Sequence, residues 1–137
     1  MVERIEDRGR LLAIIIPSEF RKPGIEFFTP NDFSQQLAYM NRPAGYTISP
    51  HVHNKVTRNV HYTLETLFVR RGRLKVDFYS DERDFVGSRI LKAGDIILLA
   101  GGGHGFTMLE ETEIIEVKQG PYSGDADKVR FEGKAVE

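Results

Sequence analysis

Short runs in which apolar and polar residues alternate recur along the chain, and Gly, Pro, Asn and Asp residues separate them. Alternation with period two is typical of half-buried β-strands, whereas the spacing of an amphipathic helix is scarce. The pattern therefore predicts an all-β protein, a sandwich or barrel, with at most one helical turn beginning at Asn31-Asp32. The expected strands cover residues 11–16, 25–29, 36–41, 46–53, 63–70, 73–79, 88–92, 96–99, 105–109 and 112–118.

The length of 137 residues is that of one domain. We expect a single unit over residues 1–137, with N-terminal strands over residues 11–41, a segment over residues 45–104 that contains the motifs described below, and a closing strand and tail over residues 112–137. The apolar run Leu11–Ile16 ends at Pro17 after six residues. This run is too short for a membrane span or a signal peptide, so it reads as a buried strand.

The charges of the chain nearly cancel, with nineteen Lys and Arg residues against twenty Asp and Glu residues. Such a balance provides no field that would attract nucleic acid or an anionic membrane, so neither is an expected partner. The chain has no cysteine. Any metal must therefore be held by nitrogen and oxygen ligands, and the composition suits a reducing cytoplasm.

The four histidines gather in or beside two short segments. His51 and His53 are separated by one residue, and in a strand such residues point to the same face, where both imidazoles can bind one ion. An exposed or hydrogen-bonded pair is the alternative interpretation. His61 follows eight residues after His53, and His104 stands in a glycine-rich segment.

Glu65 begins a predicted strand in which it alternates with Leu67 and Val69. Its carboxylate is therefore expected to face the interior, where a charge without a partner is costly. A metal ion is one possible partner. A buried arginine is the other, and Arg58, Arg70 and Arg89 are available.

Two motifs in this order resemble those of the cupin superfamily. Gly45, five residues, His51-x-His53, then Glu65 and Gly72 resemble the first motif, and Gly94-Asp95 with the later His104 resembles the second. The resemblance implies a double-stranded β-helix, or jelly-roll barrel. It also implies one divalent metal ion, which would be Zn, Fe, Mn, Ni or Co, held by His51, His53, Glu65 and His104.

The segment between His53 and Glu65 has eleven residues, more than the family pattern has, so it contains an inserted loop. Asn54-Lys55 and Arg58-Asn59 are suited to the chain reversal that would return Glu65 to the His pair. His61 is a rival ligand by its spacing from Glu65. However, His61 and Glu65 would lie on one strand with their Cα atoms about 13 Å apart, which is too far for both side chains to bind one ion.

The tail from Lys118 to Phe131 resembles small bacterial cupins associated with surface-polysaccharide biosynthesis. The leading hypothesis is an isomerase or epimerase of a sugar or sugar nucleotide, in which the metal acts as a Lewis acid while His61 or Tyr62 moves the proton. A second hypothesis is a metal-free ketoisomerase or epimerase that uses His51, His53 and Tyr46 as acid and base. An Fe(II) dioxygenase is a third hypothesis, and a non-enzymatic sugar-binding barrel is a fourth. We also expect a homodimer, in which Leu11–Ile16 is a swapped or paired edge strand.

Overall fold

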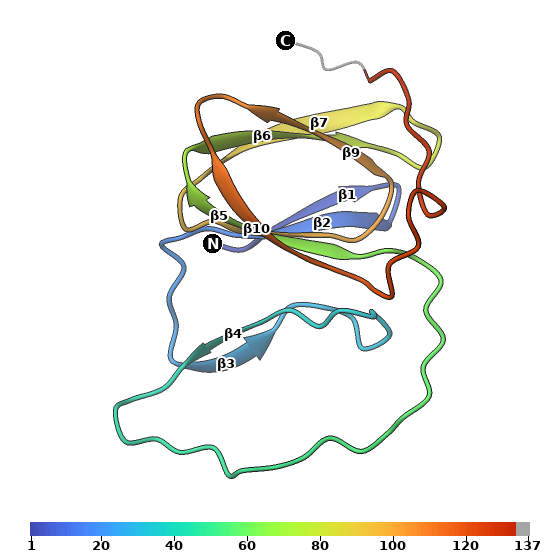
Figure 1. Cartoon of the computed structure of the whole chain (residues 1–137). Helices are drawn as coiled ribbons and strands as arrows, with labels where there is room; N and C mark the ends of the chain where they lie inside the picture. The colour runs from blue at the N-terminus through green and yellow to red at the C-terminus, as the bar shows by residue number, and fades with distance from the viewer. Residues whose placement is uncertain (134–137) are drawn as a thin grey trace.

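The computed structural model describes residues 1–133, which form ten β-strands and no helix (Figure 1). The prediction of an all-β protein is confirmed. Among the described residues no helix is long and apolar enough to cross a membrane. The strands are β1 (Glu3–Asp7), β2 (Arg10–Ile16), β3 (Gly24–Phe27), β4 (Ala38–Asn41), β5 (Glu65–Arg71), β6 (Arg73–Tyr79), β7 (Phe85–Lys92), β8 (Ile96–Leu99), β9 (Gly103–Met108) and β10 (Glu113–Lys118).

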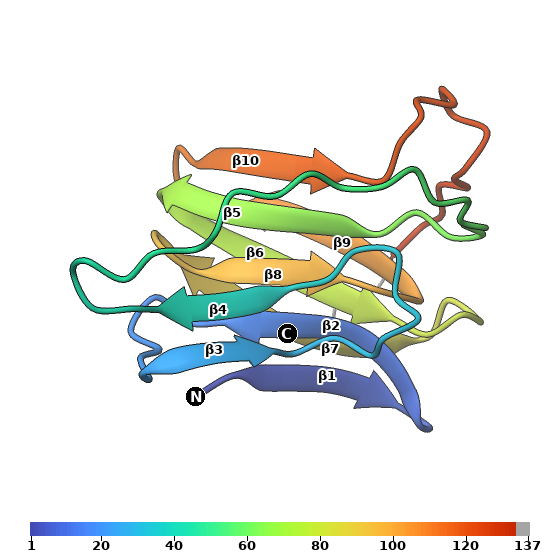
Figure 2. The same cartoon turned by 90° about the horizontal axis from the view of Figure 1, so that it is seen from below.

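Two antiparallel sheets face each other and form a sandwich, which is the main body of the molecule (Figures 1 and 2). One sheet has five strands in the order β1-β2-β8-β5-β10, and the other has three strands in the order β7-β6-β9. β3 and β4 pair with each other as a separate hairpin. Every strand pair is antiparallel, which is the arrangement expected of short strands joined by short turns.

The main core lies between the two sheets, because alternate residues of each strand point inward. Leu67 and Val69 of β5 are buried there against Leu74, Val76 and Phe78 of β6. Full burial of such a side chain contributes about 1.5–3 kcal/mol. This core fixes the faces of β5 and β6, and therefore also the direction in which their polar neighbours point.

A second apolar layer lies on the outer face of the five-stranded sheet. Ile14 of β2 and Leu98 of β8 are fully buried there with Phe28, beneath the β3–β4 hairpin. β2 is thus covered on both faces, which explains its continuous apolar run. Its neighbours are β1 and β8. Both edges of Leu11–Ile16 are therefore hydrogen-bonded within the described chain.

The first strand, β1, is a strand that the sequence pattern did not predict. Only Ile5 of its five residues is buried, and charged residues surround it. β1 lies at the edge of the five-stranded sheet and pairs with β2 in a register that puts Ile5 opposite Ala13. Its strand conformation thus comes from backbone pairing rather than from its own pattern.

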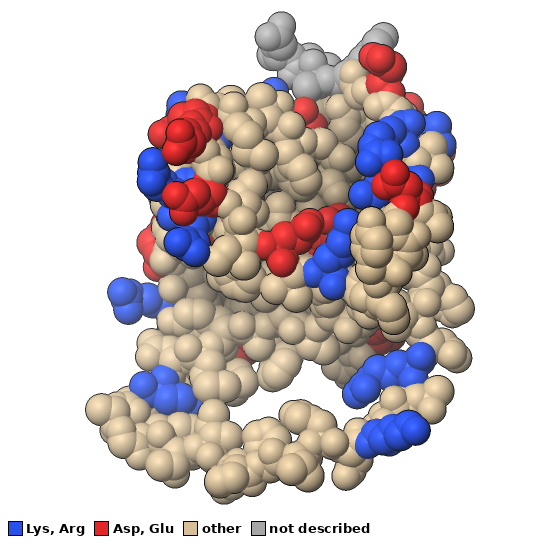
Figure 3. Space-filling view, in the orientation of Figure 1, with Lys and Arg blue, Asp and Glu red and all other residues tan. Residues whose placement is uncertain are grey.

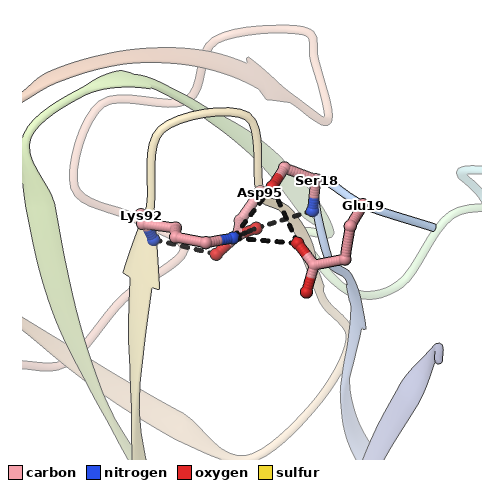
Figure 4. A network of polar contacts seen from close by, with 4 residues as sticks. All are labelled: Ser18, Glu19, Lys92 and Asp95. Atoms are coloured by element: carbon pink, nitrogen blue, oxygen red, sulfur yellow. Dashed lines mark hydrogen bonds and ion pairs between the residues drawn. The ribbon is translucent and has the colours of Figure 1, made fainter.

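The turn between β7 and β8 is held by the buried carboxylate of Asp95 (Figure 4). This carboxylate accepts backbone hydrogen bonds from Ser18 at 2.7 Å and from Lys92 at 2.8 Å. The Lys92 ammonium also contacts Glu19, at 3.0 Å. Gly94 has φ of +92°, and a Cβ there would come within 2.7 Å of Ser18 Cβ. The turn therefore requires a glycine for close approach and an acceptor for buried donors.

Residues 42–62, which we call the arm, leave the β3–β4 hairpin after β4 and join the sandwich just before β5 (Figure 1). Each of these residues is exposed, and residues 46–61 contain neither strand nor turn. The predicted strand over residues 46–53 and the predicted reversals at Asn54-Lys55 and Arg58-Asn59 are therefore absent. The physical reason is that no strand of the described chain lies beside the arm to accept its backbone hydrogen bonds.

Candidate functional site

A cavity of about 880 Å³ opens at the end of the sandwich where β5, β9 and β10 meet the C-terminal tail. Its size lies within the range of about 300–1,000 Å³ that is usual for small-molecule sites. Charged and aromatic side chains share its wall. Those that matter for the chemistry are Tyr62, Glu65, His104, Glu116, Lys118 and Lys128.

Glu65 and His104 form the centre of the cavity wall. Glu65 begins β5 and lies between Leu99 of β8 and Lys118 of β10, and His104 lies on β9 opposite Phe78. The His104 Nε2 atom is 3.1 Å from a Glu65 carboxylate oxygen, and the Glu65 side chain is only 13% exposed. The partner of the inward-facing Glu65 is thus this histidine, since Arg70 contacts Glu113 and Arg89 contacts Glu3 instead.

The glycines before His104 bring the start of β9 close to β6. Gly102 has φ of +63°, and a Cβ there would overlap the Tyr79 carbonyl oxygen. Gly103 stands opposite Tyr79 in the β6–β9 ladder, one residue before His104. The glycine run therefore positions His104 by close backbone approach, and it leads into a strand rather than into a phosphate-binding helix.

Glu116 extends the pair into a proton-sharing network. It lies opposite Leu67 on β10, so its side chain is on the inner face with Glu65, with which it shares a hydrogen bond. The hydrogen bond from His104 is the main cause that lowers the pKa of Glu65 to about 2, against the opposing effect of burial. The hydrogen bond with Glu65, followed by burial, raises the pKa of Glu116. Glu65 is therefore the ionised member, and Glu116 holds the proton they share.

The C-terminal tail closes one side of the cavity. The Phe131 ring packs edge-on against Tyr79 at 5.1 Å between centroids, and the Thr63 hydroxyl donates to Asp127 at 2.8 Å. Elsewhere on the wall Arg10 pairs with Asp81 at 3.1 Å and lies over the Tyr62 ring at 5.7 Å. These contacts give the cavity wall a polar character with charges of both signs.

The predicted site residues fall into two groups. Glu65, His104 and Tyr62 lie at the cavity. His51 and His53 lie on the arm, with ring centroids 5.2 Å apart, and His51 Nδ1 is 2.9 Å from the Ser49 carbonyl oxygen. His61 and Tyr46 are also exposed arm residues; the Tyr46 ring contacts Arg42 at 4.6 Å.

The four predicted metal ligands are thus divided between the arm and the sandwich. Within residues 1–133 no three His, Asp or Glu side chains are arranged so that they could hold a metal ion. The donors of one chain, as the structure places them, therefore do not fit the expected ion with four protein ligands.

Glu116 and part of the tail line the cavity, although the sequence pattern did not reveal them. The strand over residues 112–118 was predicted, and its alternation places Glu116 on the same side as Ile114. An acidic residue on the inward face of a predicted strand is the signal that was present in the sequence. For Lys128 and Phe131 no comparable signal exists, because apolar and polar residues do not alternate regularly along the tail and its contacts therefore cannot be predicted from the pattern.

Comparisons with known proteins found no matching family model, no matching curated protein and no matching solved structure. Function must therefore be inferred from the geometry of the cavity.

Proposed function

We propose that the chain is an enzyme with a cupin-type jelly roll that isomerises or epimerises a small polar substrate, such as a sugar or a sugar nucleotide. The observation that supports this most directly is the hydrogen-bonded network of His104, Glu65 and Glu116 on the wall of the cavity. The order of strands in the two facing sheets supports the jelly roll. Both reactions require one proton to leave a carbon beside a carbonyl and another to return.

His104 acts as the general base in this proposal. Its Nε2 faces the ionised Glu65, so the proton of the neutral ring resides on Nε2 and the lone pair on Nδ1. Nδ1 then takes the proton from the carbon next to the substrate carbonyl, and Glu65 stabilises the imidazolium that forms. In an isomerisation the imidazolium exchanges its proton with solvent and returns a proton to the neighbouring carbon, while the hydroxyl proton of that carbon passes to the former carbonyl oxygen.

Tyr62 and Glu116 supply the remaining proton chemistry. The Tyr62 hydroxyl at the cavity donates a hydrogen bond to the substrate carbonyl oxygen, where negative charge develops as the carbon loses its proton. The hydrogen bond with Glu65 raises the pKa of Glu116, so Glu116 binds a proton in preference to Glu65 behind His104. Lys118 and Lys128 add positive charge to the wall, which favours an anionic substrate.

The test is exchange of substrate protons with solvent deuterium, measured by NMR on a panel of sugar phosphates and nucleotide sugars. His104→Gln should lower the exchange rate at least about 100-fold, because the general base is lost. His61→Gln is the matched control, since His61 lies on the arm outside the cavity wall, and it should keep the wild-type rate. Wild-type protein that neither binds nor exchanges any member of the panel would overturn the proposal.

A metal-dependent enzyme is the second candidate, because Glu65 and His104 already stand side by side in the cavity. Plasma mass spectrometry on protein purified without a metal-affinity tag distinguishes the two. The metal-free mechanism predicts little bound metal and full activity after chelation. Near-stoichiometric metal that is lost in His51→Ala and Glu65→Ala, but kept in His61→Ala, would replace it by the metal-dependent mechanism.

A further inference from the structure

The arm exposes apolar side chains that no part of the described chain covers. Its exposed fractions reach 58% at Ile48 and Val56 and 89% at Val52. Its hydrogen bonds stay within the arm, such as Tyr46 N–H to Pro43, and none joins it to the rest of the described chain. An extended segment of this length loses much conformational entropy, so contacts elsewhere must compensate for it.

The sandwich has an uncovered apolar surface that faces the arm. On the outer face of the five-stranded sheet, the hairpin covers β2 and β8 but leaves Phe68, Ile115 and Val117 between 36% and 52% exposed. Figure 2 shows the arm crossing this side of β5 and β10, and Figure 3 shows an open gap between the arm and the body. β10 is also the end of its sheet and has a free backbone edge.

The sequence pattern identifies which face the arm would present to such an edge. In an extended strand over residues 46–53, Tyr46, Ile48 and Val52 lie on one face, whereas His51 and His53 lie on the other. Ile115 and Val117 are on the outer face of β10, and Glu116 is on its inner face. Pro50 suits a strand that has one unpaired edge.

The charges of the arm indicate the kind of partner. The arm contains Arg42, Lys55 and Arg58, and residues 33–64 contain no Asp or Glu. The rest of the chain consequently has sixteen basic against twenty acidic residues, a formal charge of −4. A basic arm and an acidic body on the same chain are complementary when two copies meet.

We propose that the arm of one copy adds residues 46–53 as a strand to the free edge of β10 in a second copy, forming a reciprocal dimer. The apolar face of the arm then continues the surface of Ile115 and Val117. Its opposite face places the partner's His51 and the partner's His53 on the side of Glu116, next to the cavity. The predicted strand thus forms in the dimer, and each cavity is completed by the other chain.

The first test is sedimentation velocity over protein concentrations from about 0.1 to about 100 µM, which brackets ordinary dimer affinities. Wild-type protein should be a dimer, and Ile48→Asp should raise the dimer Kd at least about tenfold. Ile90→Asp is a matched control, because Ile90 is also an isoleucine with 58% exposure but lies on β7 in the other sheet. It should leave the dimer intact.

The second test is hydrogen exchange, which reports directly on the added strand. Amides of residues 46–53 and of β10 should gain protection together as the protein concentration rises through the dimer Kd. Ile48→Asp should abolish that gain while circular dichroism shows an unchanged fold.

Three results would overturn the proposal. One is a wild-type monomer at every concentration. A second is an arm that is protected in the monomer, which would show that it folds onto its own chain. The third is a dimer that dissociates with Ile90→Asp but not with Ile48→Asp.

Discussion

The segment from Gly94 to His104 and the arm were both expected to deliver histidines to one site, and they differ in how they are held. The first segment lies within two sheets, and its buried Asp95 accepts backbone hydrogen bonds from Lys92 of the same turn and from Ser18, which follows β2. The arm is exposed throughout and its hydrogen bonds stay within it, although the Tyr62 ring at its end contacts Arg10 of β2. A sequence motif thus indicates which side chains could form a site, whereas hydrogen bonds to neighbouring strands and turns determine where those side chains lie.

The largest difference between the two segments should appear in stability. Asp95→Ala should lower the free energy of unfolding by about 3 kcal/mol, because buried backbone donors of Ser18 and Lys92 lose their acceptor. Val52→Ala, at an 89% exposed position of the arm, should change it by less than about 0.5 kcal/mol when the protein is monomeric. Denaturation by urea measures both. Equal losses of unfolding free energy in the two variants would contradict the conclusion that the turn is held more firmly than the arm.

The pH dependence of stability should also separate the two segments. Since the pKa of Glu65 falls from 4.5 to about 2 on folding, its contribution is complete above pH 4.5 and is lost as the pH falls toward 2. Glu65→Gln should remove this contribution, about 2 kcal/mol, and flatten the acid limb of the profile. His51→Gln on the arm should leave that limb unchanged. Thermal unfolding between pH 2 and pH 7 distinguishes the variants.

The smallest expected effect concerns Glu116. The shift of its pKa affects stability with the opposite sign to the shift of the Glu65 pKa. Its pKa is raised above 4.5, so ionisation of Glu116 costs stability once the pH exceeds its folded-state pKa. Glu116→Gln should therefore increase stability at pH 7, by less than about 1 kcal/mol because this side chain is largely exposed, and should have no effect near pH 4. A loss of stability at pH 7 would show that Glu116 is not the protonated member of the network.

The sequence predicted the strands wherever an apolar face meets a core. Residues 73–79 and 96–99 were predicted with their observed bounds, because their alternating or continuous apolar residues pack against the same cluster. β1 was missed because its position depends on pairing with β2 rather than on its own pattern. The strand over residues 46–53 shows the opposite case, since its alternation is clear and the described chain offers it no neighbour.

The candidate site was predicted in part for a similar reason. Glu65 and His104 come together as the motifs imply, because β5 and β9 are fixed through β8 and β6. Their pairing with His51 and His53 depends on the path of the inserted segment, and no local pattern specifies that path. The tail contributes Lys128 and Phe131 through contacts between distant residues, which spacing alone does not reveal.

The strand order of the larger sheet also affects how the protein is made. β2 pairs with β8, so Ile14 meets Leu98 only after more than eighty further residues have been synthesised. At translation rates of about 5–20 residues per second, the apolar β2 waits several seconds on the ribosome without one of its neighbours. We therefore expect nascent chains to bind ribosome-associated chaperones through residues 11–16, and to be released once β8 has emerged from the exit tunnel.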